Sequence, residues 1–344
     1  ICGDVGFGKT EIALRAAFAA VASGYQAAVL CPTTILADQH FETFSERLKN
    51  FPVNLALLRR FEPHQKQKET LEKLKSGGVD IVVGTHRLLS KDIEFKNLRL
   101  LVIDEEQKFG VGQKEKLKKF KENLDILSLS ATPIPRTLYM ALSGLRQISR
   151  IDTAPPGRKS IKTFVEPYSE RAAADAIKKE LARGGQIYFL HNRVQNIEAA
   201  AENLRKLAPA AKIKWAHARM GEKDLRKIIH DFRARKFDLL IATTIIENGL
   251  DLPNVNTLIV ADSTKLGLSQ SHQIRGRVGR SDREAFAYFL YKEKDLFGPA
   301  KERLEALEKF QELGEGYKIA ERDLEIRGAG NILGREQTGV LNKI

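Results

Sequence analysis

The sequence has 344 residues, of which 42% are hydrophobic, and a formal net charge of +13. Its length suffices for two or three domains with their own cores, and its apolar content excludes a chain that is disordered throughout. No run approaches the roughly 18 apolar residues of a membrane span, and no basic-then-apolar signal peptide opens the chain. The positive charge favours a polyanion as the binding partner, either nucleic acid or an acidic membrane surface.

Residues 1–152 alternate short apolar runs with helical patterns. Four runs are bounded by polar or turn residues, as buried parallel strands are: 27–30, 81–83, 100–103 and 126–129. Helical patterns lie between them, for example at 11–22 and 65–75. This alternation predicts an α/β domain with a parallel sheet and helices on both faces.

A second unit of the same kind follows a break. Residues 153–158, with two prolines and a glycine, can continue neither element type and predict a linker. Residues 159–295 predict a second α/β domain, with strands at 187–190, 239–242, 257–260 and 287–290. From residue 296 the pattern changes to a helix at 301–313, which Gly314-Glu315-Gly316 would end.

The chain contains only two cysteines, Cys2 and Cys31. Both sit beside apolar residues, which predicts two buried free thiols in a reducing cytoplasm. The chain also enters a glycine-rich loop directly after Ile1 and Cys2. We therefore expect a fragment that is less stable and binds nucleotide more weakly than a longer chain, because the strand before such a loop is normally central.

The first chemical motif is a phosphate-binding loop. The pattern G-x-x-x-x-G-K-[ST] is matched in full by Gly3, Asp4, Val5, Gly6, Phe7, Gly8, Lys9 and Thr10. In such a loop the backbone N–H groups surround phosphate oxygens, the lysine reaches the β/γ-phosphates and the hydroxyl ligates Mg²⁺. The following helical pattern would add a positive dipole, so the sequence predicts a site for ATP with Mg²⁺.

Acidic residues end the predicted strand at 100–103. Asp104 comes directly after the strand, followed by Glu105 and Glu106. Brought next to the phosphate loop, Asp104 would hold Mg²⁺, and Glu105 would orient and deprotonate the attacking water.

Arginines alternate with glycines at 273–280. Guanidinium groups such as those of Arg277 and Arg280 can neutralise charge on a γ-phosphate during its transfer. Alone, the same pattern fits an RNA-binding loop or a solvated basic loop. Its place in the second α/β unit favours arginine fingers, and that second unit also excludes a small-molecule P-loop kinase.

These blocks together resemble motifs I, II and VI of the superfamily 2 helicases, and the intervening motifs follow in order over nearly the whole chain. The resemblance implies two tandem RecA-like P-loop domains, 1–152 and 159–295. It places Gln273 near the γ-phosphate, Gly249 and Asp251 near the ribose, and Ser130 and Thr132 in the coupling of ATP to nucleic acid. It also implies contacts with nucleic-acid phosphates through Thr33, Thr34, Thr85, His86, Thr243 and Thr244.

Residues 323–339 resemble the translocation motif shared by the RecG and Mfd families. This resemblance implies a helical hairpin at about 301–321 within a translocation element over 296–344, and DNA contacts from Arg327 and Gln337. Glu106 in the acidic block and Ala329 resemble the Mfd family, the bacterial transcription-repair coupling factors. Two positions depart from many relatives, Gln107 and Asn248, and both remain polar.

The resemblance implies an ATP hydrolase that moves along double-stranded DNA in the bacterial cytoplasm. RNA polymerase and excision-repair factors would be partners through regions outside this chain, with no role for a membrane. Two alternatives remain. One is a RecG-type motor that remodels DNA forks, and the other is a non-enzymatic clamp that binds DNA with ATP but without turnover.

Overall fold

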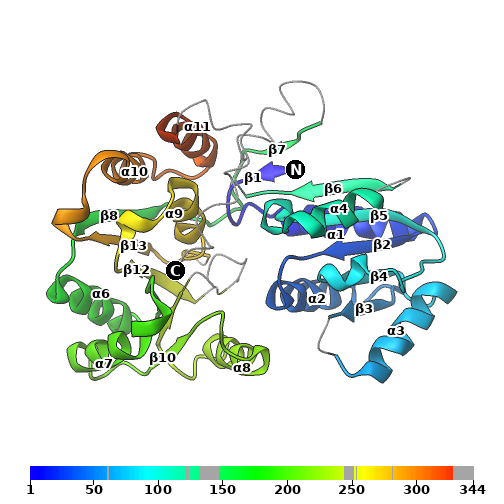
Figure 1. The fold of residues 1–344 in the computed structure, drawn as a ribbon, viewed down its shortest axis with the longest axis horizontal. Helices are drawn as coiled ribbons and strands as arrows, with labels where there is room; N and C mark the ends of the chain where they lie inside the picture. The colour runs from blue at the N-terminus through cyan, green and yellow to red at the C-terminus, as the bar shows by residue number, and fades with distance from the viewer. Residues whose placement is uncertain are drawn as a thin grey trace. The chain divides into compact units, whose positions relative to one another are not determined.

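The computed structural model describes residues 1–59, 62–120, 124–131, 147–243, 252, 254–280 and 282–327. These fall into two compact units (Figure 1). Unit 1 comprises Ile1–Cys2 and Gly8–Ala131, and unit 2 comprises Gly3–Phe7 and Thr132–Ile344.

Unit 1 is built on a five-stranded parallel sheet in the order β3-β4-β2-β5-β6. Its strands are β2 (Gln26–Leu30), β3 (Leu55–Leu58), β4 (Ile81–Gly84), β5 (Leu98–Asp104) and β6 (Asp125–Leu129). Its helices are α1 (Lys9–Ala22), α2 (Thr34–Leu48), α3 (His64–Ser76), α4 (Val111–Phe120) and the short η1 (His86–Leu89) and η2 (Glu106–Lys108).

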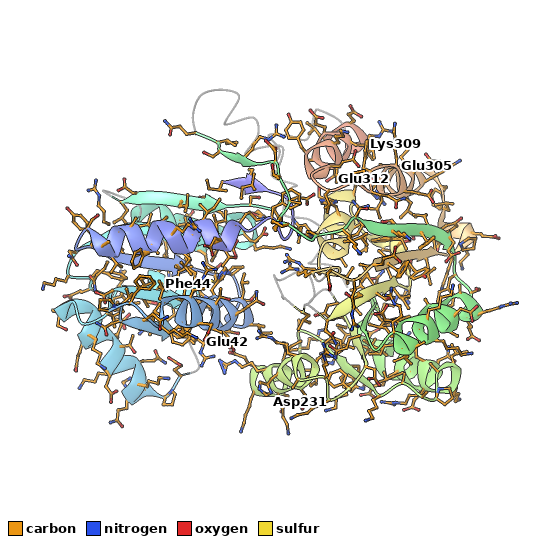
Figure 2. All side chains as sticks on the ribbon, turned by 180° about the vertical axis from the view of Figure 1, so that it is seen from behind. Glu42, Phe44, Asp231, Glu305, Lys309 and Glu312 are labelled. Carbon is orange, nitrogen blue, oxygen red and sulfur yellow. The ribbon has the colours of Figure 1, made fainter. Side chains whose placement is uncertain are left out.

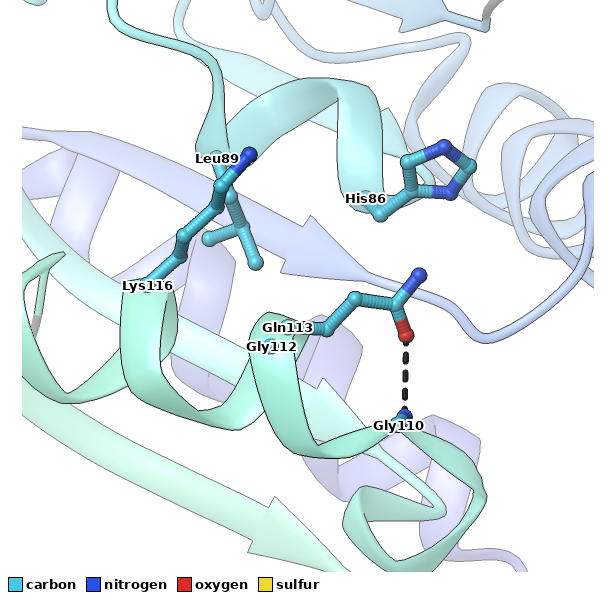
Figure 3. A pocket seen from close by; sticks show the side chains of 6 residues that line it. All are labelled: His86, Leu89, Gly110, Gly112, Gln113 and Lys116. Atoms are coloured by element: carbon cyan, nitrogen blue, oxygen red, sulfur yellow. Dashed lines mark hydrogen bonds between the residues drawn. The ribbon is translucent and has the colours of Figure 1, made fainter.

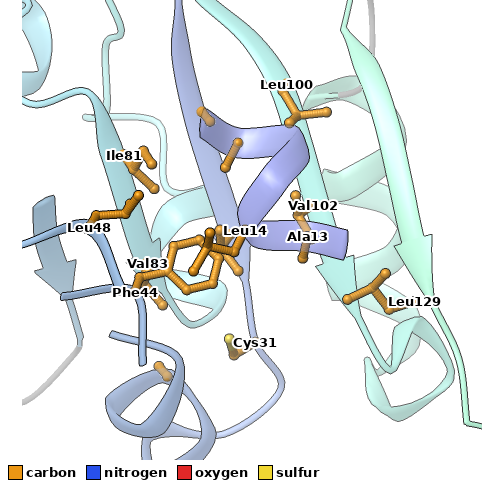
Figure 4. Close-up of a cluster of buried hydrophobic side chains, with 14 of the residues drawn as sticks. Ala13, Leu14, Cys31, Phe44, Leu48, Ile81, Val83, Leu100, Val102 and Leu129 are labelled. Atoms are coloured by element: carbon orange, nitrogen blue, oxygen red, sulfur yellow. The ribbon is translucent and has the colours of Figure 1, made fainter. Parts of the chain in front are cut away.

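Alternate strand residues of unit 1 pack into two cores. On one face, Val83 and Val102 lie with residues of α1 and α2 (Figure 4), and Val29 belongs to the same core. On the other face, neighbouring strand residues such as Val82 and Leu101 pack with α3, η1 and α4. Helices α1 and α2 therefore cover one side of the sheet and α3 and α4 the other, as the alternation predicts.

Unit 2 contains a six-stranded parallel sheet in the order β10-β11-β9-β12-β13-β8. Its strands are β8 (Ile161–Pro167), β9 (Gln186–Leu190), β10 (Ile213–Ala216), β11 (Leu239–Ala242), β12 (Val255–Val260) and β13 (Ala285–Tyr291). Its helices are α6 (Glu170–Ala182), α7 (Ile197–Leu207), α8 (Glu222–Arg233), α9 (Leu268–Arg275), α10 (Gly298–Lys309) and α11 (Gly316–Arg327), with short helical turns η3 (Val194–Asn196), η5 (Ser263–Lys265) and η6 (Glu293–Asp295). A separate two-stranded sheet pairs β1 (Cys2–Gly3) with β7 (Arg150–Ile151).

The two large sheets repeat one topology. The order β3-β4-β2-β5-β6 in unit 1 matches β10-β11-β9-β12-β13 in unit 2. Both units also contain a glutamine side chain that donates to two backbone carbonyls, an arrangement that we call the glutamine clip. Gln26, the first residue of β2, donates to the carbonyls of Leu74 and Val79 at 3.0 and 2.7 Å, and Gln186, the first residue of β9, donates to two carbonyls near the end of α8.

The structure confirms the predicted α/β class with two parallel sheets and contains every strand predicted from the sequence. In the two large sheets the sequence analysis missed the edge strands β3, β8 and β10 but predicted the edge strand β6. Lysines interrupt β8 and β10, so these two lack the continuous apolar run of a central strand. Strand β3 is apolar throughout, and this reason does not apply to it. The helix predicted at 301–313 instead runs from Gly298 to Lys309.

Gly314 lies at φ +87°, a conformation that favours glycine, between α10 and α11. The predicted helical hairpin is thus present. Both cysteines are buried and neither forms a disulfide, as predicted. Within the ranges that the structure describes, no helix combines the length and the apolar character needed to cross a membrane.

Candidate functional site

The head of α1 presents the lysine and hydroxyl of the phosphate loop. Helix α1 begins at Lys9, and its N-cap is Gly8 at φ 81° and ψ 20°. Glu11 N–H donates to the Gly8 carbonyl at 3.0 Å, which starts the first turn. Lys9 and Thr10 are half-buried in that turn, where the positive end of the helix dipole favours an anion.

The first half of the loop, Gly3–Phe7, belongs to unit 2. The Phe7 N–H donates to the Asp4 carbonyl at 3.1 Å, and Gly6 adopts φ +76°. At this φ value L side chains are rarely found, so a substitution of Gly6 would strain the backbone. A Cβ on Gly6 would also lie 1.7 Å from the guanidinium of Arg158, the end of a flexible side chain that would have to move.

The two carboxylates at the end of β5 are buried. Asp104 and Glu105 are 8% and 7% exposed. Glu105 has φ 50° and ψ 53°, and its N–H donates to the Leu129 carbonyl at 3.1 Å. The Gln107 amide donates to the Glu105 carboxylate, so the residue that departs from many relatives is in direct contact with the candidate base.

These carboxylates fit an ATP-bound Mg²⁺. In the described part of the chain no three His, Cys, Asp or Glu side chains form a cage for a metal ion. Mg²⁺ at nucleotide sites is held by one or two carboxylates together with phosphate oxygens and waters, and needs no such cage. Asp104, with a buried carboxylate at the carboxyl end of a parallel strand, offers that donor.

The candidate DNA contacts of unit 1 follow the ends of parallel strands, which meet at one edge of the sheet. Thr33 caps α2 by accepting from the Leu36 N–H at 3.3 Å, and Thr34 is the first residue of that helix. Thr85 is 2% exposed, and its hydroxyl has no hydrogen-bond partner in the structure. Ser130 follows β6, and its N–H donates to the Ile1 carbonyl at 3.1 Å.

His86 borders a cavity of about 310 Å³ (Figure 3). It begins η1, and the opposite wall is the start of α4, where the Gln113 side chain accepts from the Gly110 N–H at 3.1 Å. Lys116 also lines the cavity. A cation and an imidazole beside a helix start suit a backbone phosphate.

In unit 2, the arginine–glycine segment at 273–280 begins in the last turn of α9 and continues past its end. Gln273 and Arg277 are 7% and 5% exposed, and Arg280 is half-buried. A Cβ on Gly276 would lie 2.5 Å from the Cβ of Val5, so this glycine permits the segment to pack on Gly3–Phe7 within unit 2.

A chain of hydrogen-bonded side chains connects the Gly3–Phe7 segment to α9 and to the end of α10. His272 Nε2 lies 2.6 Å from Asp4 Oδ1, and Arg275 Nη2 lies 2.9 Å from His272 Nδ1. Because guanidinium only donates, Nδ1 accepts and Nε2 carries the proton that it donates to Asp4. Arg275 also donates to the carbonyls of Leu307 and Phe310, at the end of α10. Burial lowers the pKa of Arg275 to about 10, against the opposing effect of Asp4 and Glu315.

The sequence analysis missed a group of polar side chains that follow the strands of unit 2. His191 Nε2, Asn192 Oδ1 and His217 Nδ1 are buried atoms without hydrogen-bond partners in the structure. They follow β9 and β10, and Thr243, a predicted contact, follows β11 in the same edge. Burial, and then Arg193, lower the pKa of His191 and favour its neutral form. In the sequence, this group could have been found from the polar residues His191, Asn192 and Arg193, which directly follow the apolar run at 187–190.

Some predicted positions lie outside the described residues: Thr132, Thr244, Gly249, Asp251 and Gln337. Arg327 ends α11, and its side chain is likewise not described.

Comparison with protein families gives two matches. Residues 1–141 match the DEAD/DEAH box helicase family, and residues 172–282 match the helicase conserved C-terminal domain. The first of these is an ATP-binding helicase domain.

Curated relatives match the chain from end to end. It is 54% identical over 345 residues to the transcription-repair-coupling factor of Bacillus subtilis and 53% identical to that of Staphylococcus haemolyticus. All of this chain is covered, but only 29% and 30% of those relatives, so the chain spans about three tenths of their length.

Solved structures share the fold. RecG bound to a three-way DNA junction has a TM-score of 0.78 and 33% identity, covering 96% of this chain and 44% of that one. Saccharomyces cerevisiae Dbp5 bound to RNA and ADP BeF3 has a TM-score of 0.69 at 19% identity, covering 90% of this chain and 82% of that one. The two parallel sheets thus correspond to tandem RecA-like helicase domains.

Proposed function

We propose that this chain, which belongs to the superfamily 2 helicases and corresponds to the helicase region of transcription-repair-coupling factors, is an ATP-driven motor that moves along double-stranded DNA. The observation that carries this proposal is the 54% identity over the whole chain. The buried acids after β5 and the loop at the head of α1 are consistent with it.

In the proposed reaction each group has one task. The head of α1 binds phosphate, with Lys9 on the β/γ-phosphates, and Glu105 orients the attacking water and takes its proton. Thr10 and Asp104 would hold Mg²⁺, which when bound neutralises charge on the phosphates. Arg277 and Arg280 would neutralise charge that develops on the γ-phosphate, with Gln273 close to it. These last roles rest on the sequence pattern.

The DNA would be gripped at the carboxyl edges of the two sheets. Thr33, Thr85 and His86 in unit 1, and Thr243 with the His191–Arg193 segment in unit 2, supply hydroxyl, imidazole and guanidinium donors. Such donors suit contacts with phosphates that do not depend on base sequence. In the longer relatives, we propose, this motion displaces stalled RNA polymerase before excision repair.

A RecG-type fork motor is the second candidate, because RecG, solved on a three-way DNA junction, is 33% identical to this chain over an alignment that covers 96% of this chain and 44% of RecG. The two candidates differ in the DNA that should stimulate ATP hydrolysis. A duplex translocase responds to plain linear duplex, whereas a fork motor responds to branched DNA.

The test is steady-state ATP hydrolysis by this chain with no DNA, with linear duplex and with a fork. We expect stimulation by linear duplex, and loss of both basal and stimulated turnover in Lys9→Ala. Lys301→Ala, which removes an exposed lysine from α10, is the matched control and should behave as the unmodified chain. Stimulation by forks alone would favour the RecG reading, and DNA-stimulated turnover in Lys9→Ala would refute the assigned site. ATP and DNA binding without turnover would indicate a clamp.

A further inference from the structure

A buried imidazole contacts the candidate metal-binding acid. His40 is 2% exposed, and its Nε2 lies 2.8 Å from Asp104 Oδ2. It comes from α2, and Asp104 from the end of β5, 64 residues further along the chain. Both residues belong to unit 1.

The direction of this hydrogen bond follows from chemistry. An ionised carboxylate only accepts, so Nε2 carries the proton and donates to Asp104. The bond engages one named oxygen and so restrains rotation of the carboxylate group. Histidines and carboxylates in the second layer of a metal site fix the first layer in this way.

The protein also fixes the imidazole itself. Its ring meets Phe44, one turn later on α2, edge to face at 6.4 Å and 89°. Phe44 is fully buried in the core beneath α2 (Figure 4), whereas Glu42 on the same helix is exposed (Figure 2). Because packing fixes the position of the ring, its hydrogen bond holds the Asp104 carboxylate in one orientation.

Helix α2 links the imidazole to the candidate DNA contacts. Its N-cap is Thr33, and the Ala37 N–H donates to the Thr33 carbonyl at 3.0 Å. His40 lies within the next turn of the same continuous helix. A shift at the head of α2 would therefore be transmitted to the carboxylate through one rigid element.

We propose that His40 is a positioning residue that holds the Asp104 carboxylate in the orientation needed by the metal–nucleotide complex and ties it to the helix headed by Thr33. This inference rests on the proposed ATPase function. A purely structural polar pair would stabilise unit 1 without affecting the metal, and this difference can be measured without turnover.

The experiment measures binding of a fluorescent ADP analogue to the full chain as Mg²⁺ is raised from a chelated baseline. The Mg²⁺ midpoint is the concentration that gives half of the Mg²⁺-dependent increase in nucleotide binding. His40→Leu and His40→Asn should raise this midpoint by about tenfold or more. Leu removes the donor, and the shorter Asn places its amide away from Asp104. His40→Gln, whose amide nitrogen can reach the position of Nε2, should remain close to the unmodified chain. Affinity without Mg²⁺ should be unchanged in all three.

Leu48→Ala is the matched control, since it disturbs the same core from the same helix two turns beyond His40. It should lower the melting temperature and leave the Mg²⁺ midpoint unchanged. The inference would be overturned by an unshifted midpoint in both His40→Leu and His40→Asn, or by an equal shift in Leu48→Ala. If the unmodified chain shows no Mg²⁺-dependent nucleotide binding, the proposed metal site fails as well.

Discussion

Glu105 occupies a backbone conformation that side chains rarely adopt. Its φ of 50° and ψ of 53° lie in the left-handed region, where a non-glycine residue is held at a free-energy cost of about 1–3 kcal/mol. The strain is maintained by its N–H bond to Leu129 and by burial of the side chain. Strain of this kind gathers at functional sites, which supports the role of Glu105 as the base.

Glu105→Gln tests that role by replacing one carboxylate oxygen with an amide nitrogen. The amide keeps the shape of the side chain but cannot accept a proton, so single-turnover ATP hydrolysis should fall by about 10²- to 10⁴-fold. Binding of a fluorescent nucleotide should be retained. Glu94→Gln, which changes an exposed carboxylate paired with Lys75, should leave both quantities unchanged. Normal hydrolysis in Glu105→Gln would assign the base elsewhere.

The sequence proposes single catalytic residues where a local motif carries them, as at Lys9 and Asp104, and these roles stay predictions. It did not predict His40 or His191. Their partners and environments come from strands and helices distant in sequence, and no spacing along the chain encodes a contact across 64 residues.

At the level of secondary structure, the repeated glutamine clip joins a central strand to the end of a helix in each unit. Gln186 donates to the carbonyls of Phe232 and Phe237, both at 2.8 Å, as Gln26 does to its own pair. Gln26 and Gln186 are 3% and 4% exposed. Hydrogen bonds of a buried amide position the element that accepts them.

Gln26→Leu and Gln186→Leu should each destabilise the chain, by about 1–3 kcal/mol, because the buried carbonyls lose a donor. The measurement is denaturant unfolding, with hydrogen exchange to locate the effect. Exchange should increase in unit 1 for Gln26→Leu and in unit 2 for Gln186→Leu. Gln65→Leu, at an exposed position of α3, is the control. An effect as small as that of the control would show that the clip contributes nothing.

The α10–α11 hairpin is attached through Arg275. Arg275→Met keeps an unbranched apolar stem but removes the bonds of the guanidinium to the carbonyls of Leu307 and Phe310, and we expect a loss of about 2–4 kcal/mol in the free energy of unfolding. Hydrogen exchange in α10 should accelerate. Arg322→Met, which removes exposed ion pairs with Glu302 and Glu325, should cost less than about 1 kcal/mol. If the α10 amides were equally protected from hydrogen exchange in Arg275→Met and Arg322→Met, Arg275 would not attach the hairpin.

For the whole molecule, the sequence predicted the central strands and the two-sheet class because buried parallel strands are continuous apolar runs. Strands β8 and β10 were not predicted because lysines interrupt their apolar residues. The strand order shows that the two units repeat one topology, and the equivalent strands β2 and β9 both begin with a glutamine. The same scaffold places acids after β5 in unit 1 and arginines after α9 in unit 2.

The formal charge of +13 has a measurable consequence for DNA binding. Contacts with phosphates release counterions, so the logarithm of affinity for duplex should fall linearly with the logarithm of salt concentration, by a slope of about 0.9 per phosphate neutralised. Two duplexes of unrelated sequence should give the same line. The measurement is fluorescence anisotropy over a salt series.

Two charge reversals of equal size distinguish DNA contacts at one edge of the sheet from the effect of net charge on DNA binding. Arg193→Glu alters an exposed arginine after β9, and Lys301→Glu makes the same change in net charge on α10. If DNA runs along the carboxyl edge of unit 2, Arg193→Glu should reduce the salt slope by about 1 and weaken binding by more than Lys301→Glu does. Equal losses in the two variants would mean that net charge alone attracts DNA, and the carboxyl edge would then have no special part in binding it.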